Sequence, residues 1–168
     1  LGKAVVTVAD SKTFTSTAAK VNGETLDGDG TVVITALHST AAADLSKITA
    51  GSVTAALSED LTFTGTLGKA VVTVADSKTF TSTAAKVNGE TLDGDGTVAI
   101  TALDATAAAD LSKITAASVT AAVADDVTFT GTIGKAVVTV ANTKTFTSTA
   151  AKVNGETLDG DGTVAITA

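Results

Sequence analysis

The sequence predicts an all-β protein built as a β-solenoid, a parallel β-helix in which short coils stack along one axis. Three observations lead to this prediction: a long internal repeat whose copies begin at positions 1, 67 and 133, short segments that alternate apolar and polar residues, and a close, nearly regular spacing between similar segments. The alternative that the same repeat allows is a string of tandem small β-sandwich modules.

The repeat is almost perfect. Residues 1–32 return unchanged at 67–98, and the copy that begins at 133 differs over this length only at Ile133, Asn142 and Thr143. The chain therefore divides into repeat 1 (residues 1–66), repeat 2 (67–132) and a partial repeat 3 (133–168). A short repeat buries its apolar face only by stacking on its neighbours, so we expect the three to form one continuous solenoid.

Within one period, short segments alternate in the two-residue rhythm of β-strands and are bounded by Gly, Asp, Asn and Ser. These predicted strands are "LTFTGT" (61–66), "AVVTV" (70–74), "TFTST" (79–83), "TVAIT" (97–101), "SKITA" (112–116) and "SVTAAV" (118–123). The best helical candidate, "STAAADLSKI" at 39–48, is short and weakened by Thr and Ser.

The spacing of similar segments sets the expected coil. Such segments begin at positions 62, 79, 97, 113 and 128, which predicts about four coils in each repeat and about ten in the chain. In this arrangement one set of side chains points inward: Phe63, Phe80, Phe129, Val72, Val74 and Ile100. A second set points outward: Thr62, Thr64, Thr79 and Thr81.

Composition excludes several classes of protein. The net charge is −7 with Lys as the only strong cation, so the basic stripe that nucleic-acid binding requires is missing. There is no cysteine for disulfides or thiolate metal sites. No apolar run reaches the roughly 18 residues that span a bilayer, so no membrane insertion is expected. Because no signal segment and no initiator Met are present, we expect a mature or excised piece.

Two phrases carry a resemblance to known proteins. "AADLSKITAxSVTAAxxxDxTFTGTxGKAVVTVAxxKTFT", together with "GDGTVAITALDATAAADLSKIT", resembles the tandem repeats of very large bacterial secreted or surface proteins, adhesin-like or surface-layer-like. The resemblance covers the whole chain and includes no catalytic motif. It implies an extracellular or cell-surface location and a stiff, elongated structural role in adhesion, assembly or filament formation. "VNGETLDGDGTVVIT" is also similar to phrases in phage tail fibres.

The acidic-glycine stretch "LDGDGT" has two interpretations. Alternating carboxylates and glycines could converge on calcium, which prefers oxygen ligands. The candidate calcium ligands are Asp27, Asp29, Asp93, Asp95, Asp159 and Asp161. However, the acidic twelfth position of an EF-hand and the tandem nonapeptides of calcium-binding β-rolls are both missing. Gly28 and Gly30 could instead form a coil corner with positive φ, and a single acidic loop per repeat favours this turn. No other cofactor is predicted.

No enzyme is predicted. The only histidine, His38, is replaced by Asp104 in repeat 2, so it cannot act in every repeat. Adjacent carboxylates at 59–60 and 125–126 would face opposite ways on a strand, which suits solvated turns better than paired acid and base groups. The "GKA" at 2–4 lacks the glycine spacing and Ser/Thr of a phosphate loop.

The surface and the ends suggest partners. Rows of Thr-x-Thr would suit an ice-binding face, although the row is lost at "KITAA". A surface that recognises glycan or protein is another alternative, but Trp and Tyr, which stack on sugars, are missing. Neither end looks like a cap, and uncapped solenoid edges recruit further strands. We therefore expect end-to-end self-association or a place within a longer repeat array.

Overall fold

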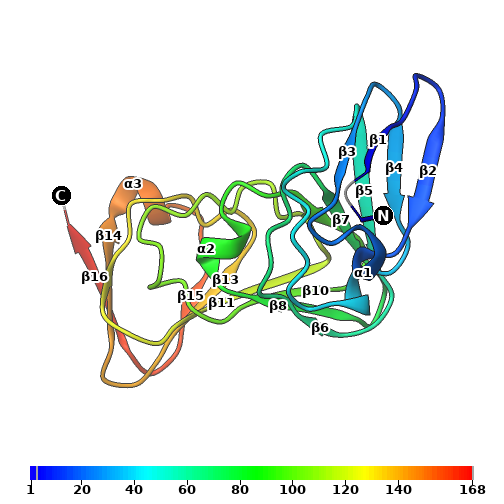
Figure 1. Ribbon diagram of the computed structural model, residues 1–168. Helices are drawn as coiled ribbons and strands as arrows, with labels where there is room; N and C mark the ends of the chain where they lie inside the picture. The colour runs from blue at the N-terminus through cyan, green and yellow to red at the C-terminus, as the bar shows by residue number, and fades with distance from the viewer. Residues whose placement is uncertain (3, 168) are drawn as a thin grey trace.

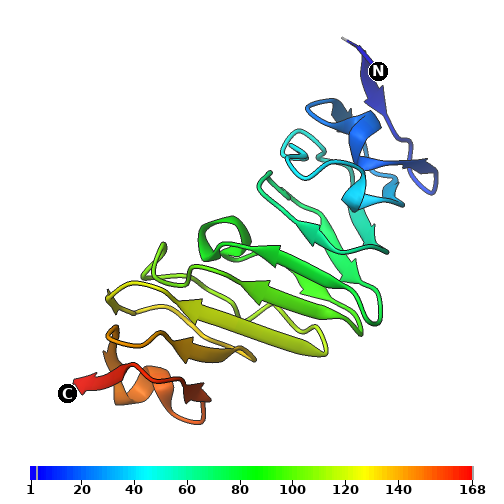
Figure 2. The ribbon, with the colours of Figure 1, turned by 90° about the horizontal axis from the view of Figure 1, so that it is seen from below.

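The computed structural model describes residues 1–2 and 4–167, and it forms a β-solenoid. Its coils stack from the N-terminus at one end to the C-terminus at the other (Figure 2). Each pairing between the named strands is parallel, as expected of coils that wind in one direction. The predicted solenoid is confirmed.

The elements are short and separated by tight corners. In chain order they are β1 (Val5–Thr7), β2 (Thr13–Ser16), α1 (Ala18–Val21), β3 (Thr25–Asp27), β4 (Thr31–Ile34), η1 (Leu37–Ser39), β5 (Ser52–Leu57), β6 (Leu61–Thr62), β7 (Val71–Val74), β8 (Thr79–Ser82), α2 (Ala84–Val87), β9 (Leu92–Asp93), β10 (Thr97–Ile100), β11 (Ser118–Val123), β12 (Val127–Thr128), β13 (Val137–Val140), β14 (Thr145–Thr149), α3 (Ala150–Val153), β15 (Leu158–Asp159) and β16 (Thr163–Thr167).

Each coil has three sides. In repeat 2 the chain runs through β7, turns into β8, continues into the single helical turn α2, and returns as β9, which pairs with β7. The same path leads from β1 through β2 and α1 to β3, and from β13 through β14 and α3 to β15 (Figure 1). Two sides of such a coil are β-strands, and the third side contains the helical turn.

The strand registers give a longer coil than the sequence spacing predicted. Along the five-stranded sheet β2-β4-β5-β7-β9, partners in successive coils are Thr13–Thr31, Thr31–Ser52, Thr54–Val71 and Val72–Leu92. The sequence comparison had placed "KITAA" beside "TVAIT". In the structure β10 pairs with β11, whereas Ile114 bridges to Leu92 on another side of the coil. With about 20 residues per coil, a repeat spans about three and a third coils rather than four, and the chain forms about 9 coils rather than about ten.

Because a repeat is about one third of a coil longer than three whole coils, each repeat is rotated by about one third of a turn about the solenoid axis relative to the repeat before it. The equivalent strands β2, β8 and β14, each one repeat after the last, lie in three different sheets of five, six and three strands. The three AAKV helices α1, α2 and α3 are offset in the same way. The identical sequence is thus presented on each side of the solenoid in turn, and identical segments never stack on each other.

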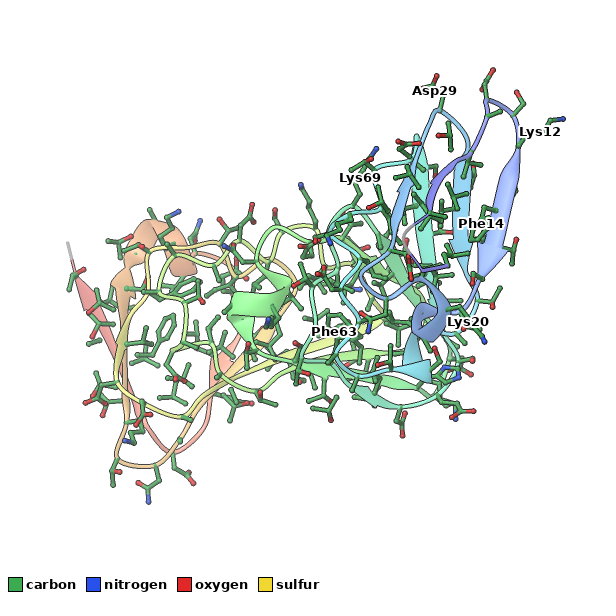
Figure 3. All side chains as sticks on the ribbon, in the orientation of Figure 1. Lys12, Phe14, Lys20, Asp29, Phe63 and Lys69 are labelled. Carbon is green, nitrogen blue, oxygen red and sulfur yellow. The ribbon has the colours of Figure 1, made fainter. Side chains whose placement is uncertain are left out.

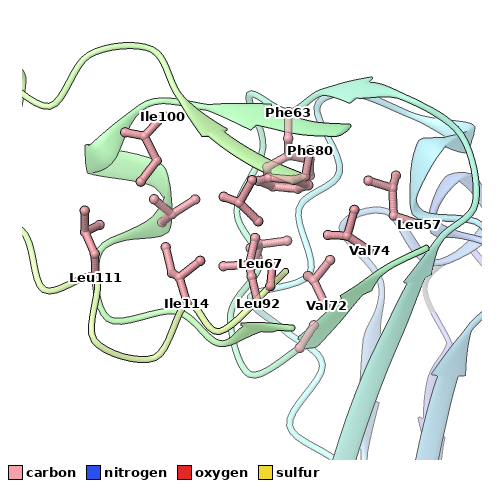
Figure 4. Close-up of a cluster of buried hydrophobic side chains, with 14 of the residues drawn as sticks. Leu57, Phe63, Leu67, Val72, Val74, Phe80, Leu92, Ile100, Leu111 and Ile114 are labelled. Carbon is pink, nitrogen blue, oxygen red and sulfur yellow. The ribbon is translucent and has the colours of Figure 1, made fainter. Parts of the chain in front are cut away.

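One hydrophobic core runs along the axis from Val8 to Phe146. The Phe63 and Phe80 rings from neighbouring coils lie with centroids 5.5 Å apart (Figure 4). The Phe129 and Phe146 rings repeat the contact with centroids 5.6 Å apart. The six side chains predicted to point inward are all buried. Of the predicted outward threonines, Thr62 and Thr64 are exposed and Thr79 and Thr81 are half-buried. Small and β-branched side chains fill the narrow interior that these few aromatic rings leave.

The helical candidate at 39–48 is not an α-helix, since this part of the chain contains the end of the 3-10 turn η1 followed by turns and two isolated bridges, at Asp44 and Ile48. The helical turns fall instead on the "AAKV" segments, which the strand pattern did not predict. Ala and Lys are good helix formers. Because so short a segment separates each β-strand from the following Asn-Gly turn, the helix ends after a single turn.

Polar side chains also join successive coils. The buried Ser82 hydroxyl donates to the Phe63 carbonyl at 2.8 Å. The "GKA" lysine Lys69 donates from Nζ to the Ala50 carbonyl at 2.6 Å. Asp60 accepts a hydrogen bond from the Thr79 amide at 2.8 Å. In each hydrogen bond the two residues are 19 positions apart, about one coil. These bonds therefore join successive coils in addition to the backbone pairing of the strands.

Candidate functional site

The acidic-glycine stretch forms a corner between β3 and β4. The Gly30 amide donates to the Val8 carbonyl of the preceding coil at 2.9 Å, and the Gly51 amide of the next coil donates to the Gly28 carbonyl at 2.9 Å. Figure 3 shows Asp29 at the outer tip of this turn. The coil corner that the turn interpretation predicts lies at Gly28 and Gly30, after β3 has crossed one side of the coil.

Glycine is required here by the close approach of two backbones. Gly28 has a φ of +93°, and a Cβ there would lie 2.3 Å from the Val8 carbonyl oxygen. The positive φ that the turn interpretation predicts for Gly30 as well is wrong, since only Gly28 has it; Gly30 is required for space alone, because a Cβ there would lie 2.4 Å from the Ala9 carbonyl oxygen. The equivalent glycines of the next repeat meet the preceding coil in the same way. The turn interpretation thus explains both glycines, since a side chain would push the coils apart.

The carboxylates of this corner are not equivalent. Asp27 and Asp93 are half-buried, and in each the Oδ1 atom is buried without a hydrogen-bond partner. The other four candidate calcium ligands, Asp29, Asp95, Asp159 and Asp161, are exposed. Among residues 1–2 and 4–167, no three His, Asp or Glu side chains gather where they could hold a metal ion. Calcium usually takes about 6 to 8 oxygens. Carbonyls and water would have to complete its shell, and calcium binding stays a prediction.

The Asn-Gly turn before β3 forms a second polar corner. Asn22 accepts a hydrogen bond through Oδ1 from the Asp44 amide at 2.8 Å, and the Gly23 amide donates to the Asp44 carbonyl at 2.8 Å. Asp44 in turn accepts from the Ser46 hydroxyl and amide, and these bonds lower the pKa of its carboxyl group. The Asn-Gly turn of the next repeat has the same arrangement, with Asp110 in the place of Asp44.

The one histidine lies beside a serine and a glutamate that sequence reasoning did not connect with it. His38 Nδ1 is 3.5 Å from the Ser58 hydroxyl, and Nε2 is 3.9 Å from a Glu59 carboxylate oxygen. His38 and Ser58 are 20 residues apart, about one coil, so the sequence indicates their proximity only when the coil length is known. Both distances exceed the roughly 2.6–3.2 Å typical of an activated nucleophile and its base. In repeat 2, Asp104 instead accepts a hydrogen bond from the Ala124 amide at 2.8 Å.

The strand faces carry little charge. Among the described strands, only β3, β9 and β15 contain a charged residue, an Asp in each case. Outward threonines align between coils, as in the pairs Thr13–Thr31, Thr79–Thr97 and Thr145–Thr163. An open depression on this surface is lined by Asp126, Val127, Thr128, Thr145 and Thr147. The described strands thus carry few charged side chains, and most of the charged residues lie in the segments between the strands.

The chain matches no protein-family model, no curated protein and no solved structure. Within the part of the chain that the structure describes, no helix is long and apolar enough to cross a membrane.

Proposed function

We propose that this chain is a structural repeat segment of an extracellular bacterial surface or fibre protein, acting as a stiff, elongated rod in adhesion, assembly or filament formation. The observation that supports this role is the unbroken stack of parallel coils around one core. Bending such a stack would open inter-coil hydrogen bonds on one side and compress the core on the other.

The composition is compatible with an extracellular setting. The chain lacks Cys, Met, Trp and Tyr, so the side chains most easily oxidised are missing. Its stability comes from stacking and polar links between coils rather than from disulfides. The resemblance to repeats of secreted and surface proteins supports the same location.

The ends support association with further coils. At the C-terminal edge, Val164 is 41% exposed and Ile166 is 51% exposed, and β16 is the last strand of its sheet. At the N-terminal edge, Val5 is 60% exposed and β1 is the last strand of its sheet. Unpaired strand edges beside apolar side chains recruit other strands. We propose that these edges pair end to end, with a neighbouring chain or within a longer array.

Small-angle X-ray scattering on chains with one, two and three added copies of the repeat tests the rod. The expected result is a cross-section that stays constant while the maximum dimension grows linearly with the number of repeats. Electron microscopy of the same samples should show straight particles. Compact particles whose cross-section grows with chain length, with or without millimolar calcium, would overturn the proposal.

An ice-binding surface is a second candidate, and the aligned threonines of β8 and β10 favour it. The alignment is limited, because Ala99 and Val137 interrupt the neighbouring row that starts at Thr81. Thermal hysteresis of the purified chain tests the idea directly. An ice-binding face would give hysteresis that a Thr97→Lys variant loses, and no hysteresis in the unmodified chain would remove this candidate.

A further inference from the structure

We propose that the corner formed by His38, Ser58 and Glu59 binds zinc or a similar transition-metal ion, with the His38 imidazole and the Glu59 carboxylate as its two protein ligands. The site lies inside repeat 1, where His38 belongs to η1 and the other two residues directly follow β5. Its residues are different from those of the acidic-glycine corner. The proposal does not depend on the rod-like role.

The polar differences between repeats 1 and 2 are confined to this corner. The two repeats differ only at positions 33, 38, 39, 51, 57, 58, 59 and 61 and at their equivalents in repeat 2. Of these positions, the four that are polar in repeat 1 lie in two short segments, at 38–39 and 58–59. All other polar residues are identical, so the fold that the two repeats share does not require this particular set. The corner is where repeat 1 has side-chain chemistry of its own.

The separation of the two ligands suits a bridging ion. His38 Nε2 lies 3.9 Å from a Glu59 carboxylate oxygen, which is too long for a direct hydrogen bond. Zinc bonds of about 2.0–2.2 Å, at a tetrahedral angle, place the nitrogen and the oxygen about 3.4 Å apart. The Glu59 side chain is 72% exposed and that of His38 is 20% exposed. A small rotation of the exposed glutamate therefore brings both atoms to one ion.

Ser58 positions the imidazole ring. Its hydroxyl lies 3.5 Å from His38 Nδ1, on the other side of the ring from Glu59. A histidine that binds a metal through one ring nitrogen usually donates the other N–H to a nearby oxygen, which fixes the tautomer and the orientation of the ring. With the proton on Nδ1 and directed at Ser58, the lone pair of Nε2 points toward Glu59. A cation between this lone pair and the carboxylate satisfies both.

The backbone on both sides of the site is held in place. Leu37, next to His38, is 0% exposed, and Leu57, next to Ser58, is 1% exposed. After Glu59, the Asp60 carboxylate accepts a hydrogen bond from a backbone amide of the next coil at 2.8 Å. Because these anchors fix the two segments, binding requires only the Glu59 side chain to move, and little conformational entropy is lost.

The equivalent corner of repeat 2 is satisfied without a metal. Asp104, in the place of His38, accepts a hydrogen bond from a backbone amide of the next coil at 2.8 Å. Asp125, in the place of Glu59, forms an ion pair with Lys144 at 2.7 Å. Within the described residues, the only ion pair of Glu59 is the long contact with His38. Repeat 1 therefore presents a nitrogen and a carboxylate ligand together, and repeat 2 does not.

The ligand types select the class of ion. Imidazole suits Zn²⁺, Cu²⁺ and Ni²⁺, whereas Ca²⁺ and Mg²⁺ take oxygen ligands. Within the part of the chain that the structure describes, no third His, Asp or Glu side chain joins the pair. A four-coordinate zinc ion would therefore keep two positions for water, on the exposed side of the corner. We expect reversible binding rather than a closed structural site.

Nuclear magnetic resonance of the tag-free chain, titrated with zinc chloride at neutral pH, tests the proposal. His38 is the only histidine, so its ring signals report on this site alone. We expect these signals to shift, to saturate at one zinc per chain and to return when a chelator is added. Nitrogen-15 shifts should place zinc on Nε2 and the proton on Nδ1. Calcium should leave the signals unchanged. No shift in millimolar zinc, or zinc on Nδ1, would overturn the proposal.

Two substitutions separate this site from a lone histidine. Glu59→Gln should weaken zinc binding at least about tenfold in calorimetry, because even outer partners of a metal site contribute about that much. Glu156→Gln, the matched control in another repeat, should leave the affinity unchanged. His38→Asp, which installs the residue of repeat 2, should abolish binding. Equal affinity in the Glu59→Gln chain and the unmodified chain would contradict the two-ligand site.

The role of Ser58 and the sufficiency of the three residues are tested separately. Ser58→Ala should weaken zinc binding by up to about tenfold, and Ser58→Thr, which keeps the hydroxyl, should restore it. Unchanged affinity in Ser58→Ala would remove the positioning role. A chain with Asp104→His, Ala124→Ser and Asp125→Glu has the three side chains in both repeats and should bind two zinc ions. One zinc per chain, with circular dichroism showing an intact fold, would contradict their sufficiency.

Discussion

The same segment occurs once inside the solenoid, from Ala84 to Thr101, and once at its C-terminal edge, from Ala150 to Thr167. Inside, Val98 and Ile100 are 0% and 2% exposed; at the edge, Val164 and Ile166 are 41% and 51% exposed. Both copies form a helical turn followed by two strands. Local sequence therefore determines the elements, and the following coil determines burial.

The N-terminal edge gives the reverse case. Phe14 is half-buried, whereas the equivalent Phe80 is fully buried against Phe63 of the preceding coil. The covering coil comes before the segment here and after it at the other edge. A core side chain is thus fully buried only when a neighbouring coil covers it, and the solenoid is stabilised mainly by the interfaces between neighbouring coils.

The largest expected effect of this difference is on large-to-small substitutions. Ile100→Ala should lower the free energy of unfolding by about 2–5 kcal/mol, because it leaves a cavity in a packed core. Ile166→Ala, the matched control at the edge, should cost less than about 1 kcal/mol, because the side chain is already half exposed. Urea denaturation followed by circular dichroism measures both. Equal costs would contradict the dependence on the covering coil.

The next effect concerns the close approach at the corner. Gly94→Ala should cost about 1–3 kcal/mol or more, because its φ is +102° and a Cβ would lie 2.2 Å from the Val74 carbonyl oxygen. Gly51→Ala is the control for the positive φ: a Cβ there would also approach a carbonyl oxygen, that of Asp29 at 2.4 Å, but the φ of Gly51 is not positive, and repeat 2 has Ala117 at that position while keeping the bond from its amide to the Gly94 carbonyl. Thermal melting compares them. A milder effect at Gly94 than at Gly51 would argue against the turn interpretation.

A smaller difference is expected for the buried serine. Ser82→Ala removes the hydrogen bond to the Phe63 carbonyl and should cost about 1 kcal/mol. Ser16, its equivalent in repeat 1, is only half-buried, and its hydroxyl makes no such bond within the described residues. Ser16→Ala should therefore change the urea midpoint less. If both variants unfold at the same midpoint, the serine link does not contribute to stacking.

The smallest effect is the pH dependence of the Asn-Gly corners. Hydrogen bonds from Ser46 and Ser112 lower the pKa of Asp44 and Asp110 below 3.8 in the folded state. Their contribution to stability is complete above about pH 3.8 and is lost as pH falls through the lowered values. In a chain with both Asp44→Asn and Asp110→Asn, acid unfolding should depend less steeply on pH. Unchanged steepness in acid titrations of both chains would contradict this assignment.

The sequence predicts the fold class and the direction of the core side chains, because a strict repeat and a two-residue alternation indicate stacked strands whatever the number of residues per coil. It does not give the coil length. "KITAA" resembles "TVAIT" in composition, yet Ile114 bridges Leu92 on another side while β11 takes the place beside β10. Only hydrogen-bond register distinguishes these pairings. The same register also brings Ser58 and Glu59 to His38.

Of the candidate site, the turn could be predicted from the sequence, but the environment of its carboxylates could not. The glycines of "LDGDGT" indicated a turn, and the structure gives the physical reason in the carbonyls of Val8 and Ala9. The buried Oδ1 of Asp27 could not be predicted, since it depends on which coil lies against it. The rotation of each repeat by about one third of a turn also follows only from the coil length, because the repeat is not a whole number of coils.

Cysteine cross-linking tests that coil length most directly, because the chain has no cysteine of its own. Ala99 and Thr120 are register partners on β10 and β11, and neighbouring strands place Cα atoms within disulfide range. An A99C/T120C chain should oxidise quickly without losing its fold. An A99C/T115C chain, which joins the positions that aligning "TVAIT" with "KITAA" would pair, should not. Rapid, fold-preserving oxidation of the second chain and not the first would contradict the three-sided coil and the rotation of the repeats.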